Sequence, residues 1–359
     1  MLESSLQLWN NDIYKYDYTF CYNHNVAVTN FFYQVEKNDI IHEPQTDMEY
    51  YYSKMCNNQA PLYCEKGEYP CFGYDFSFNH GSVMAESDLR IPTKEGREVF
   101  LDEIPKLDNI KVGYYHIRIT SDYEYIHKVF YFSSYDWYTN VDLEFVLENK
   151  KLYKFKLELV VNDAPNAYLY RTKDLVYTKD LFGNNWYRIL CEYRKAFPTN
   201  ILVKFMCSSL HGQLSSLNTK WKTKEEVEDE KLKICWIVNA ADYTIVDEKR
   251  YMKNDKVIYK LMDNEKPYKH DIRLQSFLLA KVRAKTASVV AVDIKRVARI
   301  HTDNISFRDV DPKLNIKGLK AEAKTTNVNG MKWNHVNEGL HKCKCGEYVK
   351  FEDLKSHCT

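Results

Sequence analysis

The stretch VARIHTDNISF, residues 297–307, alternates apolar residues with other residues on both sides of His301-Thr302-Asp303-Asn304. Alternation of this kind is typical of a half-buried strand, and an Asp-Asn pair favours a turn. The stretch is therefore predicted to form a β-hairpin that holds the Asp303 carboxylate where its two strands turn.

A second carboxylate ends a strand in PCFGYDFSFNHGSVMA, residues 70–85. The short apolar run stops at Asp75, a polar loop follows at residues 79–81, and Ser82 is placed to cap a helix that begins at Val83. The sequence thus predicts two acids, each at the end of a strand.

Two carboxylates on neighbouring strands can bind a pair of divalent cations about 3.5–4 Å apart, which is the arrangement that phosphoryl transfer uses. Oxygen ligands of this kind favour Mg²⁺. The alternative is that Asp75 and Asp303 are ordinary turn aspartates, the commonest setting for either one alone.

Composition places the chain among ordinary globular proteins. It has 359 residues, 45% of them apolar and 28% charged, with a net charge of +1. It contains no apolar run of membrane-spanning length, and residues 1–10 lack the pattern of a secretory signal, so an intracellular protein that does not enter membranes is expected. Most of the ten cysteines stand singly, which favours free thiols over disulfides.

The middle of the chain is expected to form antiparallel strands. Residues 115–120, 128–132 and 151–161 alternate apolar and polar side chains between turn-forming residues. The mixed-charge run at residues 220–232 is interpreted as a solvated connection that leads into further strands.

Two segments have helical spacing. Residues 186–214 predict a helical hairpin interrupted at Pro198, with Gly212 as a helix terminator. Residues 271–291 predict a long helix with apolar residues at intervals of three and four.

Cationic residues precede and begin the second helix of this hairpin. Arg194 and Lys195 come before KFMCSSLHG, residues 204–212, which begins with Lys204. These three cations can bind a triphosphate if two helices bring them together. Isolated cations are more often solvated surface groups, and Ser208, Ser209 and Gly212 are also what a helix end contains.

Together these segments resemble the active-site motifs of family B DNA polymerases, in the family's order. DFSFNHGS at residues 75–82 is similar to Asp-x-x-Ser-Leu-Tyr-Pro-Ser, and residues 204–212 are similar to Lys-x-x-x-Asn-Ser-x-Tyr-Gly. RIHTDN at residues 299–304 is similar to Tyr-x-Asp-Thr-Asp-Ser. The resemblance runs from about residue 50 to residue 335, and the motif separations leave room for the two insertions of the protein-primed viral, organellar and linear-plasmid enzymes.

The resemblance implies an α+β right-hand polymerase with an antiparallel-sheet palm, helical fingers, insertions and a short or truncated thumb. The expected segments are an amino-terminal linker or exonuclease remnant (1–49), the first palm segment (50–99), an insertion like the terminal-protein region (100–174), the fingers (175–214), a second insertion (215–265), the second palm segment (266–325) and a short thumb or tail (326–359). In the family, such insertions contact a terminal protein and encircle the template.

The resemblance also assigns roles to single residues. Asp75, Asp303 and the backbone carbonyl of Phe76 would hold two Mg²⁺ ions. The nucleotide would be bound by Lys204, Arg194, Lys195, His80, Ser209 and Gly212. DNA phosphates would be bound by Arg273, Lys281, Arg283, Lys285, Lys320 and Lys324, although charge runs of this kind are equally consistent with solvated faces.

Three histidines depart from the family's pattern. His80 and His211 stand where the family has tyrosines, the first of which excludes ribonucleotides, and His301 stands where the third motif has its first aspartate. Sugar discrimination is therefore in doubt. Each histidine is also readily explained as an ordinary buried hydrogen-bonding group.

Proofreading is not expected in this chain, because too few residues precede Asp75 to hold the exonuclease carboxylates. A separate chain would have to supply that activity. The carboxyl-terminal tail offers soft ligands for Zn²⁺ at Cys343, Cys345, His357 and Cys358. Adjacent His357 and Cys358 rarely reach one ion together, so a three-ligand site, an intermolecular site and no site remain alternatives.

Three functions are consistent with these residues. The first is a DNA-templated DNA polymerase of a viral or plasmid genome, with primer-template DNA, deoxynucleoside triphosphates and a terminal-protein primer as partners. The second is a polymerase-fold protein that binds nucleic acid but has lost catalysis. The third, a zinc-dependent interaction module, depends on the tail alone.

Overall fold

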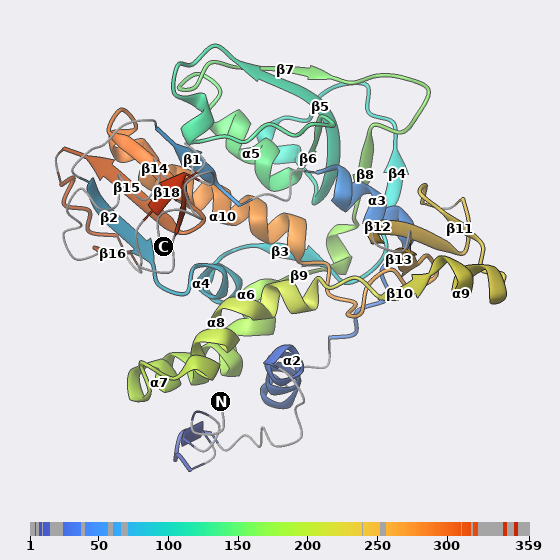
Figure 1. Ribbon diagram of the computed structural model, residues 1–359. Helices are drawn as coiled ribbons and strands as arrows, with labels where there is room; N and C mark the ends of the chain where they lie inside the picture. Colours follow the sequence, from blue (N-terminus) through green and yellow to red (C-terminus); the bar gives the residue numbers. More distant parts are fainter. Residues whose placement is uncertain are drawn as a thin grey trace. The chain divides into compact units, whose positions relative to one another are not determined.

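The computed structural model of the protein describes residues 4, 7–8, 10–14, 24–36, 40–56, 60–65, 71–238, 240–251, 256–309 and 311–316, and the backbone of residues 319–321, 340–342 and 348–350 (Figure 1). Its contacts divide the chain into two compact units. Unit 1 comprises Met1–Asn58, His80–Thr120 and Phe132–Lys281, and unit 2 comprises Gln59–Asn79, Ser121–Tyr131 and Val282–Thr359. The fold is of the mixed α+β class, as the sequence predicts.

Unit 2 is organised around a five-stranded antiparallel sheet in the order β1-β14-β15-β2-β16 (Figure 1). The strands of this unit are β1 (Leu62–Cys64), β2 (Cys71–Phe76), β14 (Val297–His301), β15 (Asn304–Arg308), β16 (Leu319–Ala321), β17 (Leu340–Lys342) and β18 (Tyr348–Lys350). The predicted hairpin at residues 297–307 is confirmed, because β14 and β15 pair directly across the turn at Thr302 and Asp303.

A buried lysine fastens the edge of this sheet. Lys128 is only 3% exposed, and its Nζ donates to Glu65 Oε1 at 2.8 Å and to the carbonyls of Val297 at 2.7 Å and Ile294 at 3.2 Å. The Nζ also lies 5.0 Å from the centre of the Tyr63 ring. A buried ammonium must have its donors satisfied, so these bonds tie the segment after β1 to the start of β14.

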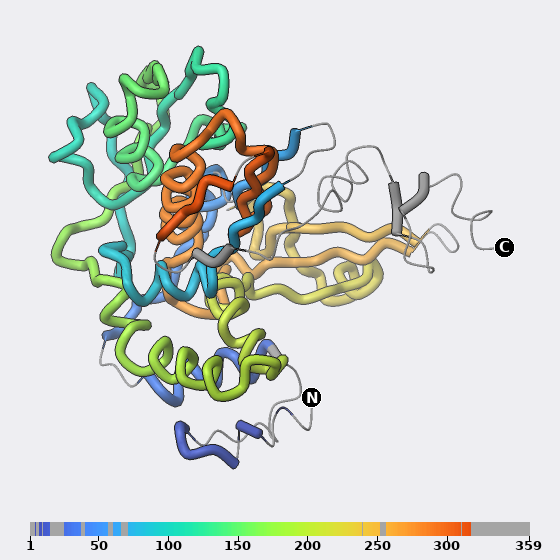
Figure 2. The backbone as a smooth tube through the Cα atoms, turned by 90° about the vertical axis from the view of Figure 1, so that its left-hand side faces the viewer, coloured from blue at the N-terminus to red at the C-terminus, as the bar shows by residue number. Residues whose placement is uncertain are grey.

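The described residues of unit 1 form three further sheets. They have the orders β4-β8-β5-β6, with β7 also paired to β5, then β3-β9, and β10-β13-β12-β11. The strands are β3 (Arg90–Pro92), β4 (Arg97–Val99), β5 (Gly113–Ser121), β6 (Trp137–Thr139), β7 (Phe155–Leu159), β8 (Ala167–Leu169), β9 (Leu175–Tyr177), β10 (Thr219–Thr223), β11 (Ile234–Cys235), β12 (Tyr243–Tyr251) and β13 (Lys256–Asp263). Figure 2 shows β10, β12 and β13 side by side as an extended ribbon of yellow to orange tube.

The α-helices are α2 (His24–Val35), α3 (Asp47–Met55), α4 (Asn79–Glu86), α5 (Asn140–Glu148), α6 (Thr178–Phe182), α7 (Arg188–Ala196), α8 (Ile201–Leu214), α9 (Lys224–Asp229) and α10 (Gln275–Val290). The short helices are η1 (Leu107–Asn109), η2 (Ile126–Lys128), η3 (Thr172–Asp174), the π-helical η4 (Gly183–Tyr187) and η5 (Ala291–Asp293). Within the described residues, none of the helices combines the length and the apolar character that a membrane crossing requires.

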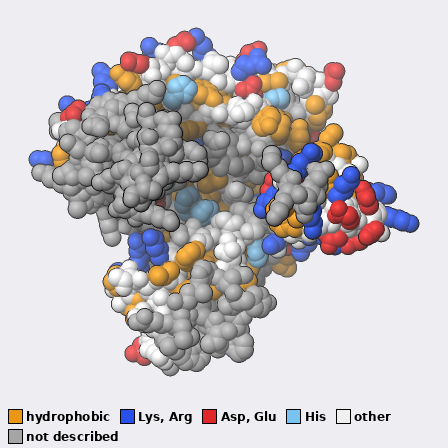
Figure 3. Space-filling view, in the orientation of Figure 1, with side chains coloured by type: hydrophobic (Ala, Val, Ile, Leu, Met, Phe, Trp, Pro, Cys, Tyr) orange, Lys and Arg blue, Asp and Glu red, His pale blue; other side chains and the backbone are white. Residues whose placement is uncertain are grey.

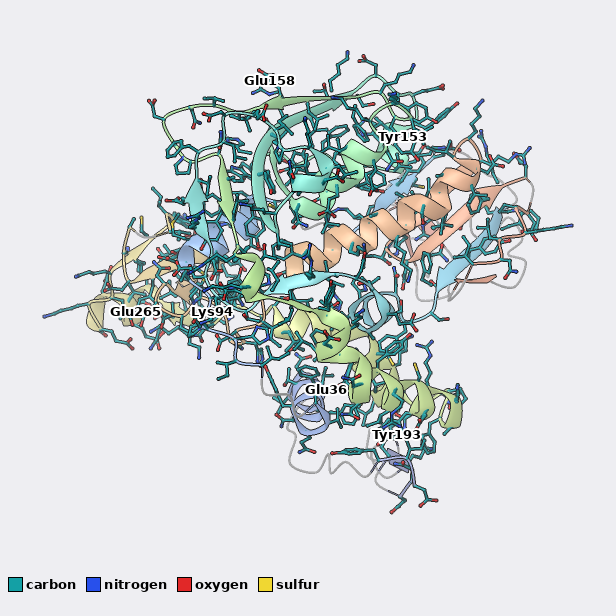
Figure 4. All side chains as sticks on the ribbon, turned by 180° about the vertical axis from the view of Figure 1, so that it is seen from behind. Glu36, Lys94, Tyr153, Glu158, Tyr193 and Glu265 are labelled. Carbon is teal, nitrogen blue, oxygen red and sulfur yellow. The ribbon has the colours of Figure 1, made fainter. Side chains whose placement is uncertain are left out.

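Helix α7 ends at Ala196 and α8 begins at Ile201, so the break falls at Pro198 as the sequence predicts. A proline disrupts the interior of a helix. Asn200 then caps α8, its side chain accepting hydrogen bonds from the backbone N–H groups of Leu202 and Val203. The prediction that Gly212 terminates the helix is wrong, since α8 continues to Leu214. Figure 4 labels Tyr193 of α7.

Helix α2 is tied to the helical segment that leads into this hairpin. Glu36, at the end of α2 and labelled in Figure 4, accepts hydrogen bonds from the backbone N–H groups of Asn185 at 3.0 Å and Trp186 at 2.6 Å. The rings of Phe32 and Phe182 stack with their centres 5.1 Å apart. A polar anchor and aromatic packing thus hold the helices together.

A buried ion pair holds several segments of unit 1 in place. Arg273 and Glu49 side chains are each 2% exposed and form two parallel hydrogen bonds of 2.6 and 2.8 Å. Arg273 also donates to the carbonyl of Glu43 at 2.8 Å, and Tyr170 donates its hydroxyl to Glu49 at 3.0 Å. This bidentate geometry fixes the chain just before α10 against α3.

Four local expectations are wrong in detail. Lys128 ends the short helix η2 and residues 129–132 form no strand, and residues 151–154 form a turn before β7. Residues 220–232 contain most of β10 and all of α9, which Thr223 caps. Helix α4 begins at Asn79, so Ser82 lies inside the helix and does not cap it.

We expect Arg273→Met to lower the free energy of unfolding by about 3–5 kcal/mol, because it leaves the Glu49 carboxylate buried without its cation. Urea denaturation followed by circular dichroism measures this loss. The control is Lys94→Met, which removes an ion pair with Glu43 whose side chains are each 47% exposed, and which should leave the free energy of unfolding nearly unchanged because solvent screens the pair. Equal losses in both variants would contradict the assigned role of burial.

Candidate active site

The two predicted carboxylates come from directly paired strands of unit 2. In the register of β2 and β15, Asp75 lies opposite Asn304, the residue after Asp303. The backbone N–H of Phe76 donates to the carbonyl of Asp303 at 3.0 Å. Both aspartates are half-buried. Strand pairing places Asp75 near the end of β2, beside the turn at Asp303 that leads into β15.

The turn between β14 and β15 orients Asp303. Thr302 takes a left-handed backbone conformation with φ 59°, which is uncommon for a β-branched residue. Its hydroxyl lies 2.7 Å from Asp303 Oδ1 and 2.6 Å from the carbonyl of His301. The hydrogen bond to the carboxylate restrains the Asp303 side chain next to the strand end.

Two phenylalanines, Phe76 and Phe78, follow Asp75 in the chain. Phe76 is 1% exposed, and the Lys285 ammonium lies 4.5 Å from the centre of its ring. Phe78, in the turn after β2, also has a left-handed conformation with φ 58°. Such a conformation is strained for a bulky residue, and strain of this kind collects at functional sites.

This donor set fits Mg²⁺. Within the described residues, no group of three or more His, Cys, Asp or Glu side chains is arranged to hold a metal ion. Mg²⁺ is usually held by one or two carboxylates together with waters and substrate phosphates, so two acids beside a strand end are sufficient. The arrangement is suited to metal-assisted phosphoryl transfer.

Helix α8 of unit 1 presents the predicted cation. Lys204 is exposed, and Ser208 lies one turn later and donates its hydroxyl to the Lys204 carbonyl at 2.9 Å. Gly212 follows on the same face, where an added Cβ would meet no other atom within 4 Å. Ser209 is half-buried beside this face.

The last turn of α7 carries the other two predicted cations, Arg194 and Lys195, which are both exposed. Arg194 forms a side-chain hydrogen bond with Cys207 of α8, whose pKa is raised to about 12 by burial. Because α7 and α8 pack as a hairpin, all three cations belong to one helical element.

A pair of stacked histidines joins α4 to α8 within unit 1. The rings of His80 and His211 are 4.1 Å apart between centres and 3° from parallel. Burial, and then the neighbouring His80, lower the pKa of His211 from 6.5 to about 3. Near neutral pH His211 is therefore an uncharged ring within a stack.

The residues predicted to bind DNA differ in how far their side chains are exposed. Arg273 is buried in its ion pair with Glu49, and Arg283 is 6% exposed, so neither presents a charge to an external phosphate as the sequence predicted. Lys281 is partly exposed and pairs with Asp88 at 2.8 Å. The apolar spacing of the helix does not distinguish a cation that is buried by its own ion pair from one on the surface.

The remaining predicted residues lie towards the carboxyl end. Lys320 is opposite Asp75 in the pairing of β16 with β2, which places its backbone beside the acid. Lys324 and the candidate zinc ligands Cys343, Cys345, His357 and Cys358 lie outside the described residues. His301 is exposed at the end of β14.

Sequence reasoning did not find three features of the site. The His80–His211 stack, the Lys285 contact with Phe76 and the left-handed backbone of Phe78 all arise from tertiary packing. No local sequence pattern predicts them. The one available signal was that two of the histidines that depart from the motifs, His80 and His211, are the two members of the stack.

The two units thus define a mixed α+β protein with a pair of carboxylates at a hairpin turn and a cationic helical hairpin. No protein-family model matches the sequence, and the comparison with curated proteins finds no match. Among solved structures, the fold is similar to Phi29 DNA polymerase complexed with single-stranded DNA, with a TM-score of 0.52, 13% identity, and coverage of 80% of this chain and 48% of that chain.

It is also similar to Phi29 DNA polymerase complexed with primer-template DNA and incoming nucleotide substrates, with a TM-score of 0.50 and 15% identity over 80% of this chain and 49% of that chain. The chain spans about half the length of these structures. The likeness establishes a fold that resembles part of the Phi29 DNA polymerase structure.

We expect the His80–His211 stack to make stability fall with acidification. The unfolded chain takes up a proton at His211 near pH 6.5, whereas the folded chain takes it up only near pH 3, so this stability is complete above pH 6.5 and is lost as the pH falls towards 3. Urea midpoints at pH 7.5 and pH 5 should differ less in His211→Phe than in the wild type. His127→Gln, which changes an exposed histidine, should keep the wild-type difference.

Proposed function

We propose that this chain is a DNA-templated DNA polymerase that adds deoxynucleotides to a 3′ hydroxyl by two-metal phosphoryl transfer. The observation that carries the proposal is the pairing of β2 with β15, which brings Asp75 beside the Asp303 turn in a fold similar to Phi29 DNA polymerase. The order of the three motifs in the sequence supports the same conclusion.

Asp75, Asp303 and the backbone carbonyl of Phe76 would hold the two Mg²⁺ ions in this mechanism. When bound, such ions activate the attacking hydroxyl and stabilise the charge of the leaving pyrophosphate. The acids act as anionic ligands, and the hydrogen bond from Thr302 keeps the Asp303 carboxylate oriented. The bond from the Phe76 N–H to the Asp303 carbonyl holds this backbone in place, which suits a carbonyl ligand.

Lys204, Arg194 and Lys195 would bind the incoming triphosphate. Each is exposed on the α7–α8 hairpin, and charge-assisted bonds to phosphate oxygens are among the strongest that a side chain can make. The open space at Gly212 and the small side chain of Ser209 leave room for the nucleotide to approach this face.

The DNA partner is proposed to contact the partly exposed Lys281 and Lys285, together with Lys320 and Lys324. On this proposal, residues 50–99 and 266–325 form the palm, residues 175–214 the fingers, and residues 100–174 and 215–265 the two insertions. A role in copying a viral or plasmid genome, with a terminal-protein primer, belongs to the same proposal.

A second candidate function is nucleic-acid binding without synthesis. The observation that favours it is the His80–His211 stack, because it changes the chemistry at two positions of the nucleotide site. Such a protein would bind primer-template DNA in a salt-sensitive manner but would not extend it.

We expect the wild-type chain to extend a primer with Mg²⁺ and deoxynucleotides, and Asp75→Asn or Asp303→Asn to lower the rate by at least about a thousandfold, since metal binding contributes several kcal/mol to the transition state. Asp309→Asn, which changes an exposed carboxylate just after β15, is the matched control and should remain active. Extension that survives both active-site changes would refute the assignment, and tight binding without any extension would favour the second candidate.

Lys204→Ala should raise the KM for deoxynucleotides roughly tenfold or more, because a charge-assisted bond to phosphate is lost. Steady-state primer extension across nucleotide concentrations measures this change. The control is Lys179→Ala on α6, where the ammonium lies 4.9 Å from the Tyr177 ring. A KM that is unchanged in Lys204→Ala would remove this residue from the nucleotide site.

A further inference from the structure

A cavity of about 240 Å³ lies within unit 1. It is formed by α2, residues 40 and 42, α6 and residues 271–272. Four apolar side chains make one part of its lining, namely Phe32, Ile40, Leu181 and Ile272. Small-molecule sites are mainly apolar cavities in which a few polar groups fix the orientation of the ligand. The polar groups of this lining therefore decide which ligand fits.

The polar part of the lining is rich in hydrogen-bond acceptors. Glu36, labelled in Figure 4, is 8% exposed, and both backbone N–H groups that it binds reach Oε1. Within the described part of the chain, Glu36 Oε2 has no hydrogen-bond partner. Asp271 Oδ1 and both ring nitrogens of His42 are buried and also lack a partner among the described residues. A buried polar atom without a partner costs free energy, so this lining favours a ligand that donates hydrogen bonds.

The charged groups of the lining are all acidic. Glu36 and Asp271 supply two carboxylates, and the described residues that line the cavity include no lysine or arginine. Burial, and then the charge of Arg273, lower the pKa of His42 to about 4, so His42 is neutral near pH 7. Arg273 itself is paired with Glu49. The exposed surface differs, because Figure 3 shows acidic side chains with basic side chains beside them where α9 lies in Figure 1. The cavity therefore favours a cation.

The segment that carries Asp271 is held in place by its neighbours. Gln45 donates to the carbonyls of His270 at 2.9 Å and Ile272 at 3.4 Å, on either side of Asp271. The hydroxyl of Tyr33, another lining residue, lies 3.1 Å from His270 Nδ1. A lining that is already ordered loses little conformational freedom when a ligand binds.

We propose that this cavity binds a small primary amine with an apolar body, whose ammonium group is held by the carboxylates of Glu36 and Asp271. An ammonium group has three N–H donors and no acceptor, which matches a lining whose acceptors outnumber its donors. The apolar body packs against the other part of the lining. None of the lining residues is among those assigned to metal ions, the nucleotide or DNA, so this site is additional to the proposed polymerase function.

Other ligands match the lining less well. An anion would be repelled by both carboxylates. A neutral apolar molecule would leave Asp271 Oδ1 and the His42 nitrogens buried without partners. A divalent cation that keeps its waters gains nothing from the apolar part of the lining. An amine on an apolar body uses both parts.

Isothermal titration calorimetry of the full chain with phenethylamine at neutral pH tests the site. Phenethyl alcohol, which has a hydroxyl in place of the ammonium group, should bind about tenfold more weakly or worse, because hydrogen bonds between charged groups are the stronger ones. Asp271→Asn should weaken binding of the amine about tenfold or more for the same reason. His42→Phe should weaken it less, since a hydrogen bond to a neutral ring contributes less.

Asp180→Asn is the matched control, because it changes an exposed carboxylate of α6 that does not line the cavity, and it should leave the affinity unchanged. A phenethylamine that carries a diazirine on its ring should label peptides of α2 and residues 40–42 in the wild-type chain, which locates the site without any variant. Equal affinity for the amine and the alcohol, equal losses in the Asp271 and Asp180 variants, labelling only outside the lining segments, displacement of the amine by Mg²⁺, or no saturable binding would each overturn the proposal.

Discussion

Antiparallel pairing of β2 with β15 is the constraint on which the candidate active site depends. The side chains of a strand alternate between its two faces. A shift of one residue in the pairing of β2 with β15 would therefore turn the Asp75 side chain to the other face of the sheet. The bond from the Phe76 N–H to the Asp303 carbonyl and the pairing of β16 on the other edge of β2 fix this register from both sides. Buried Lys128 then secures the start of β14, the strand that leads into the turn.

The exposed cations of unit 1 follow from a different kind of constraint, which lies within that unit. The apolar residues of α8 are buried, among them Leu202, Met206 and Leu210. Because a helix repeats every 3.6 residues, burial of that stripe leaves Lys204 and Ser208 on the outer face. The cationic face is thus a consequence of core packing and of the Asn200 cap that starts the helix.

The sequence was informative where function follows from local pattern. Alternation around the Asp-Asn pair predicted the hairpin that holds Asp303, and a proline between two apolar helical stripes predicted the break between α7 and α8. It was uninformative where tertiary contacts decide. Arg273 has the spacing of an exposed cation, but Glu49, far away in the chain, takes it into the core, and mixed charge at residues 220–232 concealed a strand and a capped helix.

The histidines of the site change its chemistry more than its shape. His80 and His211 pack as parallel rings, which preserves an aromatic contact between α4 and α8. An imidazolium at His211 would add positive charge close to a bound triphosphate, but the lowered pKa of His211 keeps that ring neutral at pH 7. In the proposed polymerase, metal ions and Lys204, Arg194 and Lys195 would then balance the charge of the phosphates. On the proposed function, the stack would present an uncharged surface to the nucleotide, and the α7–α8 hairpin would supply the electrostatic recognition.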